Sequence, residues 1–134
     1  MPELSLGEEG LAEVPRARHW VVRWCAEAGV EEDVLDVVEL VTSELVANAY
    51  QHGRPPVHLA LARTAHDAET TTGSVVCVEL EVSDAGVGRT PVVRDADEED
   101  LGGRGLALVD MLASAWGVRH SDDAGTTVWC RLAA

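Results

Sequence analysis

Apolar residues recur with helical spacing in two stretches near the start of the chain. Residues 11–28 place apolar side chains on one helical face, and Gly29 follows as a typical helix end. A second pattern begins near Glu31 and ends at Gly53, and the prolines at 55–56 prevent its continuation. The sequence therefore predicts two amphipathic helices. The apolar stripe of the second helix is broad and consists of Val34, Leu35, Val37, Val38, Val41, Leu45, Val46 and Ala49.

The rest of the chain alternates short apolar segments with turn signals. The predicted strands cover residues 3–6, 57–62, 75–82, 116–120 and 126–132. A Thr-rich polar connection is expected over 63–74, an acidic loop over 89–103 and a third helix over 104–115. Residues 121–125 carry a hairpin turn signal, so the strands on either side are antiparallel. These elements predict an α/β (α+β) two-layer sandwich, with about three helices covering one face of a mostly antiparallel mixed sheet.

The chain has 134 residues, the size of one domain, so we expect a single domain over residues 1–134. The three cysteines, Cys25, Cys77 and Cys130, form no CxxC pair, which favours small buried hydrophobes over a metal or redox site. No apolar run reaches the ~20 residues that span a membrane. Residues 1–10 also lack the basic and apolar regions of a secretory signal. A cytoplasmic protein without a membrane partner is expected.

The net charge of −14 disfavours direct binding to nucleic acid, because phosphates would be repelled. Acidic residues concentrate over 8–13, 27–39 and 95–100. Two interpretations stay open: the acids serve solubility, or they form an acidic face for a basic partner.

The second helix carries polar residues one turn apart. Glu44 and Asn48 are four positions apart, so their side chains lie together, and His52 continues the same face. A glutamate can act as a general base, and an amide oxygen suits a hard cation such as magnesium. The alternative is an exposed polar face, with His52 as a partner of the helix C-terminal dipole.

A first glycine-rich segment follows the strand predicted over 75–82. That strand delivers Asp84 to the end of the sheet, where a carboxylate can accept a hydrogen bond from the amino group of adenine. Gly86 and Gly88 remove side chains where a ligand must approach closely. A simple turn is the alternative.

A second glycine-rich segment opens the third helix. Gly102, Gly103, Arg104 and Gly105 precede Leu106, and the free amides of a helix N-terminus form an anion site. Arg104 could add charge-assisted contacts to a phosphate. The alternative is a flexible loop. Neither a P-loop nor a Rossmann fingerprint is present.

In this order, the motifs resemble those of the GHKL superfamily, which includes histidine kinases, gyrase-type ATPases, a heat-shock chaperone family and MutL. Residues 43–52 resemble its N box, 84–88 its first glycine box and 103–108 its second. Residues 125–132 are similar to its closing strand. The resemblance covers about residues 11–132 and implies the Bergerat ATP-binding fold, with ATP and Mg²⁺ as cofactors.

Among these domains, the chain is similar to stand-alone anti-sigma factor serine/threonine kinases of the RsbW and SpoIIAB type. The resemblance implies that Glu44 is the general base, Asn48 the magnesium ligand and Asp84 the adenine reader. The remaining nucleotide contacts are expected at His52, Gly86, Gly88, Gly102, Gly103, Arg104, Gly105 and Leu106. The implied partners are a sigma factor, an anti-sigma factor antagonist of the STAS type, or both. The relatives dimerise, so a homodimer is one assembly to expect.

Three functions stay open on the sequence. The first is a protein serine/threonine kinase, the second a non-catalytic ATP-binding partner-switching module, and the third a regulatory domain that binds another ligand in the same cleft. Retention of both Glu44 and Asn48 favours the enzyme. The acidic loop over 89–103 departs from the more basic lid expected near phosphates. A histidine kinase is disfavoured, because no receiver, phosphoacceptor or sensor segment accompanies the domain.

Overall fold

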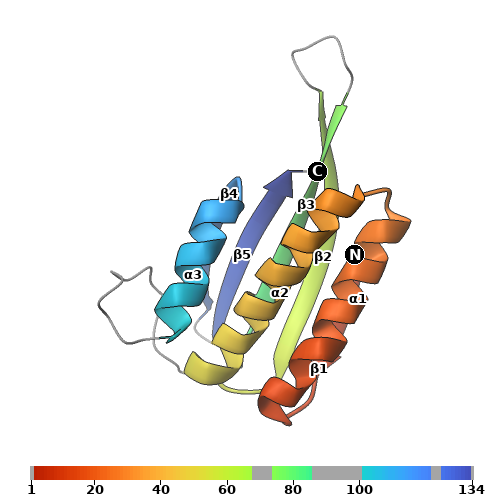
Figure 1. Ribbon diagram of the computed structural model, residues 1–134. Coiled ribbons are helices and arrows are strands. Elements are labelled where there is room, and N and C mark those ends of the chain that lie inside the picture. The colour runs from red at the N-terminus through yellow and green to blue at the C-terminus, as the bar shows by residue number, and fades with distance from the viewer. Residues whose placement is uncertain (1, 68–73, 86–100, 122–124, 134) are drawn as a thin grey trace.

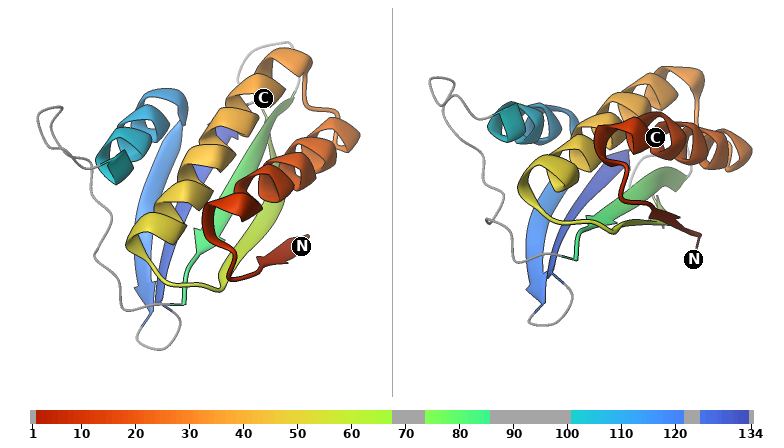
Figure 2. Two further views of the ribbon diagram at one scale, coloured as in Figure 1. Left: turned by 60° about the horizontal axis from the view of Figure 1, so that its bottom comes forward. Right: turned by 90° about the horizontal axis from the view of Figure 1, so that it is seen from below.

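The computed structural model describes residues 2–67, 74–85, 101–121 and 125–133. It has two layers, a five-stranded sheet in the order β1-β2-β3-β5-β4 and a layer of helices on one face of it (Figures 1 and 2). Every described strand pair is antiparallel. The predicted two-layer α+β sandwich is therefore confirmed.

The strands follow the predicted order but differ in length. They are β1 (Glu3–Leu6), β2 (Val57–Asp67), β3 (Ser74–Ser83), β4 (Ala115–Ser121) and β5 (Gly125–Ala133). The polar connection predicted over 63–74 is wrong at both ends, because β2 and β3 pair as far as Asp67 and Ser74. Backbone pairing in a hairpin does not require apolar side chains. Figure 1 shows this hairpin extending beyond the helices, where no core imposes an apolar alternation.

The helical layer consists of η1 (Gly10–Glu13), α1 (Val14–Glu27), α2 (Glu32–His52) and α3 (Leu101–Leu112). In Figure 1, α2 lies between α1 and α3. Gly29 has a φ of 90°, which confirms it as a helix stop. The helix α3 begins at Leu101 rather than at Arg104, because a glycine run is tolerated in a first helical turn. No helix in the described ranges is long and apolar enough to cross a membrane.

The core lies between the helices and the sheet. Four members of the predicted α2 stripe, Val38, Val41, Leu45 and Val46, are at most 1% exposed. The three cysteines are buried and free, as predicted. Burial raises the pKa of the Cys25 thiol to about 11 and that of Cys130 to about 12.

A side-chain hydrogen bond joins the last turn of α3 to the strand that follows it. The Trp116 indole Nε1 donates to Asp110 Oδ1 at 2.7 Å. Trp116 also packs against the core together with Leu112. The C-terminal end of α3 is thereby fixed to β4.

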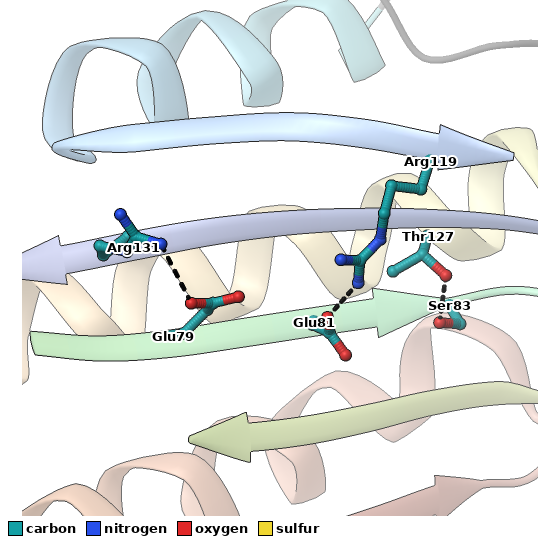
Figure 3. Close-up of polar contacts among 6 residues, drawn as sticks. All are labelled: Glu79, Glu81, Ser83, Arg119, Thr127 and Arg131. Atoms are coloured by element: carbon teal, nitrogen blue, oxygen red, sulfur yellow. Dashed lines mark hydrogen bonds and ion pairs between the residues drawn. The ribbon is translucent and has the colours of Figure 1, made fainter. Parts of the chain in front are cut away.

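The face of the sheet away from the helices carries polar side chains that pair across strands (Figure 3). The Ser83 and Thr127 hydroxyls lie 2.7 Å apart, and Arg119 forms an ion pair with Glu81. Arg131 donates to Glu79 at 3.4 Å. An antiparallel sheet with one solvated face alternates in this way, so this face is chemically separate from the helix-covered face.

Candidate functional site

The C-terminal half of α2 carries the predicted polar residues on successive turns. Asn48 is buried, with 4% of its surface exposed, whereas Glu44 and His52 are half-buried. Leu45 and Ala49, which follow Glu44 and Asn48 in the sequence, are buried in the core. Packing of α2 against the core therefore fixes the positions of Glu44 and Asn48 along and around the helix.

The polar groups of Glu44 and Asn48 are unpaired among the described residues. Within the described part of the chain, neither the Glu44 carboxylate nor the Asn48 amide makes a hydrogen bond, and Glu44 makes no ion pair there. Both polar groups are therefore available to a ligand that binds beside this end of α2.

Asp84 lies one residue beyond β3 and is held from both sides. Its N–H donates to the Thr126 carbonyl at 2.9 Å, and the next N–H, of Ala85, donates to the Arg54 carbonyl at 2.9 Å. The residue is only 7% exposed. These bonds fix Asp84 between the start of β5 and the segment that follows α2.

Two glycines make room for Asp84. A Cβ atom on Gly53 would lie 2.3 Å from both Cγ and Oδ2 of Asp84, and 2.8 Å from the Ala49 carbonyl oxygen. Gly125 has a φ of 78°, and a Cβ there would lie 2.2 Å from the Asp84 carbonyl oxygen. Gly53 has an extended φ of −107°, so it is required for the close approach and not for a left-handed turn. The sequence indicated Gly53 as a helix stop, and Gly125 as the end of a turn and the first residue of the segment similar to the family's closing strand.

Asp84 also belongs to a polar row across the end of the sheet. Val82 and Val128 are paired and buried, so two residues further on Asp84 and Thr126 face each other on the same, helix-covered side. Thr126 pairs in turn with His120 of β4. The Thr126 Oγ1 and His120 Nδ1 atoms lie 3.3 Å apart. No role was predicted for Thr126 or His120 from the sequence. The strand register alone places Thr126 opposite Asp84 and His120 opposite Thr126.

The structure describes only some residues of the two predicted glycine-rich segments. Gly86 and Gly88 lie outside the described residues. Residues 102–105 form the first turn of α3, so they are helical rather than a loop before the helix, and nothing is described of the Arg104 side chain. Leu106 is 1% exposed and packs in the core. Its burial anchors the start of α3.

The three motifs meet at one end of the sandwich. Figure 1 shows the C-terminal end of α2, the N-terminal end of α3 and the adjoining ends of β3 and β5 at the same end of the molecule. The first N–H groups of a helix have no intrahelical partner, so the start of α3 directs backbone N–H donors to this end. The structure thus gathers a base candidate, an amide, a buried carboxylate and a helix N-terminus.

The family model for the histidine kinase-like ATPase domain matches residues 8–132. The chain belongs to this family. A histidine kinase-like ATPase domain of the GHKL type implies ATP binding. This supports an ATP-binding regulatory domain.

Solved structures also resemble this histidine kinase-like ATPase domain. One is the histidine kinase domain from the Erythrobacter litoralis EL346 blue-light activated histidine kinase, with 18% identity and a TM-score of 0.44. The match covers 96% of this chain and 67% of that one. The comparison with curated proteins gave no match.

The residues present fit the magnesium that commonly accompanies ATP in this family. The described residues contain no group of three or more His, Cys, Asp or Glu side chains able to hold a metal ion. Magnesium does not need such a cage, because it keeps several waters and takes its other ligands from substrate phosphates. Asn48 is a largely buried residue whose amide has no described protein partner, and its oxygen could serve as the protein ligand in this arrangement.

Proposed function

We propose that this histidine kinase-like ATPase domain is a magnesium- and ATP-dependent protein serine/threonine kinase. In this proposal it is an anti-sigma factor that phosphorylates an anti-sigma factor antagonist. The observation that carries the catalytic part is the pair on α2. A half-buried Glu44 carboxylate, without a described protein partner, is placed one helical turn from the buried Asn48 amide.

Each group has a separate task in phosphoryl transfer. Magnesium, when bound, neutralises charge on the phosphates, and the Asn48 amide oxygen would hold it. Glu44 accepts the proton of the attacking seryl or threonyl hydroxyl. Asp84 accepts a hydrogen bond from the adenine amino group, and this fixes the other end of the nucleotide.

The kinase activity is tested with labelled ATP and the antagonist recovered by pull-down from the native cell. Transfer of the γ-phosphate to a serine or threonine of the recovered protein is the expected result. Glu44→Gln should abolish transfer and keep ATP binding. Glu27→Gln is the matched control, because Glu27 is an exposed acid on α1 paired only with Arg23 among the described residues. ATP binding without transfer by the unaltered chain would favour the non-catalytic partner-switching module instead.

The proposed partner surface is the acidic start of α2. Glu31, Glu32 and Asp33 are exposed there, at the end of α2 opposite to the one that carries Asn48. Sigma factors carry basic surfaces that contact DNA, and an acidic face is complementary to such a surface. Attraction between exposed charges is screened beyond ~8 Å at physiological ionic strength. The association rate should therefore fall as salt rises.

The partner proposal has its own test. The triple variant Glu31→Gln, Glu32→Gln, Asp33→Asn should associate more slowly with the sigma factor at low salt and should bind ATP normally. A salt-insensitive association rate would contradict the electrostatic proposal. Binding of the purified domain to DNA in a mobility-shift assay would contradict the proposal that it acts through protein alone.

A further inference from the structure

The helix-covered face of the sheet changes from apolar to polar at the row formed by Asp84, Thr126 and His120. One row further in, the side chains are valines, namely Val82, Val128 and Val118. The change to a carboxylate, a hydroxyl and an imidazole occurs at the end where the nucleotide motifs gather. The row is thus the polar end of an otherwise apolar surface.

His120 belongs to the same side of the sheet as Thr126. Along β4, Trp116 and Val118 pack against the core, and His120 is the next residue of that alternation. Its neighbour Arg119 faces the opposite side, where it pairs with Glu81 (Figure 3). The His120 ring thus lies on the same side of the sheet as Thr126, and the Arg119 side chain lies on the opposite side.

The Thr126 hydroxyl can donate one hydrogen bond and accept two. Its protein partner therefore determines whether the hydroxyl donates to a ligand or accepts from it. Its residue is 5% exposed, and its described side-chain partner is His120 Nδ1. If Nδ1 accepts, the hydroxyl proton points at His120 and the oxygen lone pairs remain for a ligand. Asp84, one residue beyond the adjacent strand β3, also offers only acceptors when it is ionised.

We infer that His120 is a specificity-determining, positioning residue that fixes the Thr126 hydroxyl as an acceptor beside Asp84. Two neighbouring acceptors match a base that carries an exocyclic amino group, and they reject a base that carries an oxo group at that position. The inference rests on the proposed nucleotide site and extends it from one adenine reader to a three-residue row. His120 acts through Thr126 and touches no reacting atom.

The test compares ATP and GTP binding by calorimetry in the full chain. His120→Ala frees the hydroxyl to donate, so the ratio of ATP to GTP affinity should fall by about three- to tenfold, the effect of one neutral hydrogen bond. His120→Asn places an amide oxygen where Nδ1 lies and should restore the ratio. Arg119→Ala, on the other side of the same strand, is the matched control and should leave the ratio unchanged.

A double-mutant cycle separates this role from a structural one. Thr126→Val removes the hydroxyl, and in that background His120→Ala should have no further effect on the ratio. An unchanged ratio in His120→Ala, or additive effects of the two substitutions, would overturn the inference and leave the proposed ATP site standing. If the unaltered chain bound neither nucleotide, the proposed function and this inference would both fail.

Discussion

Gly53 and Asp84 lie so close together that no side chain fits between them. A methyl group on Gly53 would overlap the Asp84 carboxylate, with both Cγ and Oδ2 at 2.3 Å. One residue ends the helix that carries Glu44 and Asn48, and the other follows the strand that leads into the first glycine box. The contact therefore sets the spacing between the helix that carries Glu44 and Asn48 and the proposed adenine reader Asp84.

Gly53→Ala should weaken ATP binding at least about tenfold. The added methyl group displaces the Asp84 carboxylate, and a hydrogen bond to a charged group is worth roughly 1.5–3 kcal/mol. Overpacking should also lower the free energy of unfolding by about 1–3 kcal/mol. Calorimetry and urea denaturation measure the two effects. Gly7→Ala is the matched control, because the nearest atom to its Cβ would be a Glu13 carboxylate oxygen at 3.9 Å.

Asp84→Asn should reduce the preference for adenine without unfolding the domain. The amide keeps the volume of the carboxylate and loses the charge that strengthens the bond to the adenine amino group. We expect ATP and ADP to bind about tenfold more weakly, with GTP little changed. Equal affinity of the unaltered protein for ATP and GTP would remove the proposed role of Asp84.

Asn48→Ala and Glu44→Ala should fail in different ways. Removal of the Asn48 amide should abolish the magnesium dependence of ATP binding, measured by titration with and without the metal. Removal of the Glu44 carboxylate should keep ATP affinity and lose phosphoryl transfer, because positioning survives and proton acceptance does not. Full transfer by Glu44→Ala would show that another group accepts the proton.

The sequence predicted the elements whose side chains alternate clearly. The apolar stripe of α2 and the strands β3 and β5 are where periodicity placed them, because each buries one face. The β2–β3 hairpin was predicted too short, mainly because β2 continues over residues 63–67, most of which are polar, and pairs there with β3 through the backbone. Apolar periodicity reflects the burial of one strand face. The outer part of this hairpin extends beyond the helices, so burial against them imposes no such pattern there.

The candidate site was predicted through motifs, and those motifs name only part of it. Glu44, Asn48 and Asp84 were visible because their spacing and context carry chemistry. The strand register brings Thr126 and His120 to the site, and that register depends on how β3, β5 and β4 align. Gly53 belongs to the site because it lies close to Asp84, about 30 residues later in the sequence, and no local pattern encodes this contact.

The buried thiols predict a loss of stability at alkaline pH. The folded pKa of Cys130 is raised to about 12 from 9.0, because burial disfavours the thiolate. Its contribution is fully present below a pH of about 9 and is lost as the pH rises toward 12, since only the unfolded chain releases this proton. Urea denaturation at pH 8 and 10.5 should show a smaller decrease for Cys130→Val than for the unaltered chain. Equal decreases would show that Cys130 is not the group responsible.

The bond between Trp116 and Asp110 gives the domain an intrinsic optical probe of helix α3. The indole is fixed to the last turn of the helix whose first turn contains residues 102–105. A rotation of α3 on nucleotide binding would change both the hydrogen bond and the polarity around the ring. With Trp20, Trp24 and Trp129 replaced by phenylalanine, the emission of the remaining indole would follow α3 in real time, without any attached dye.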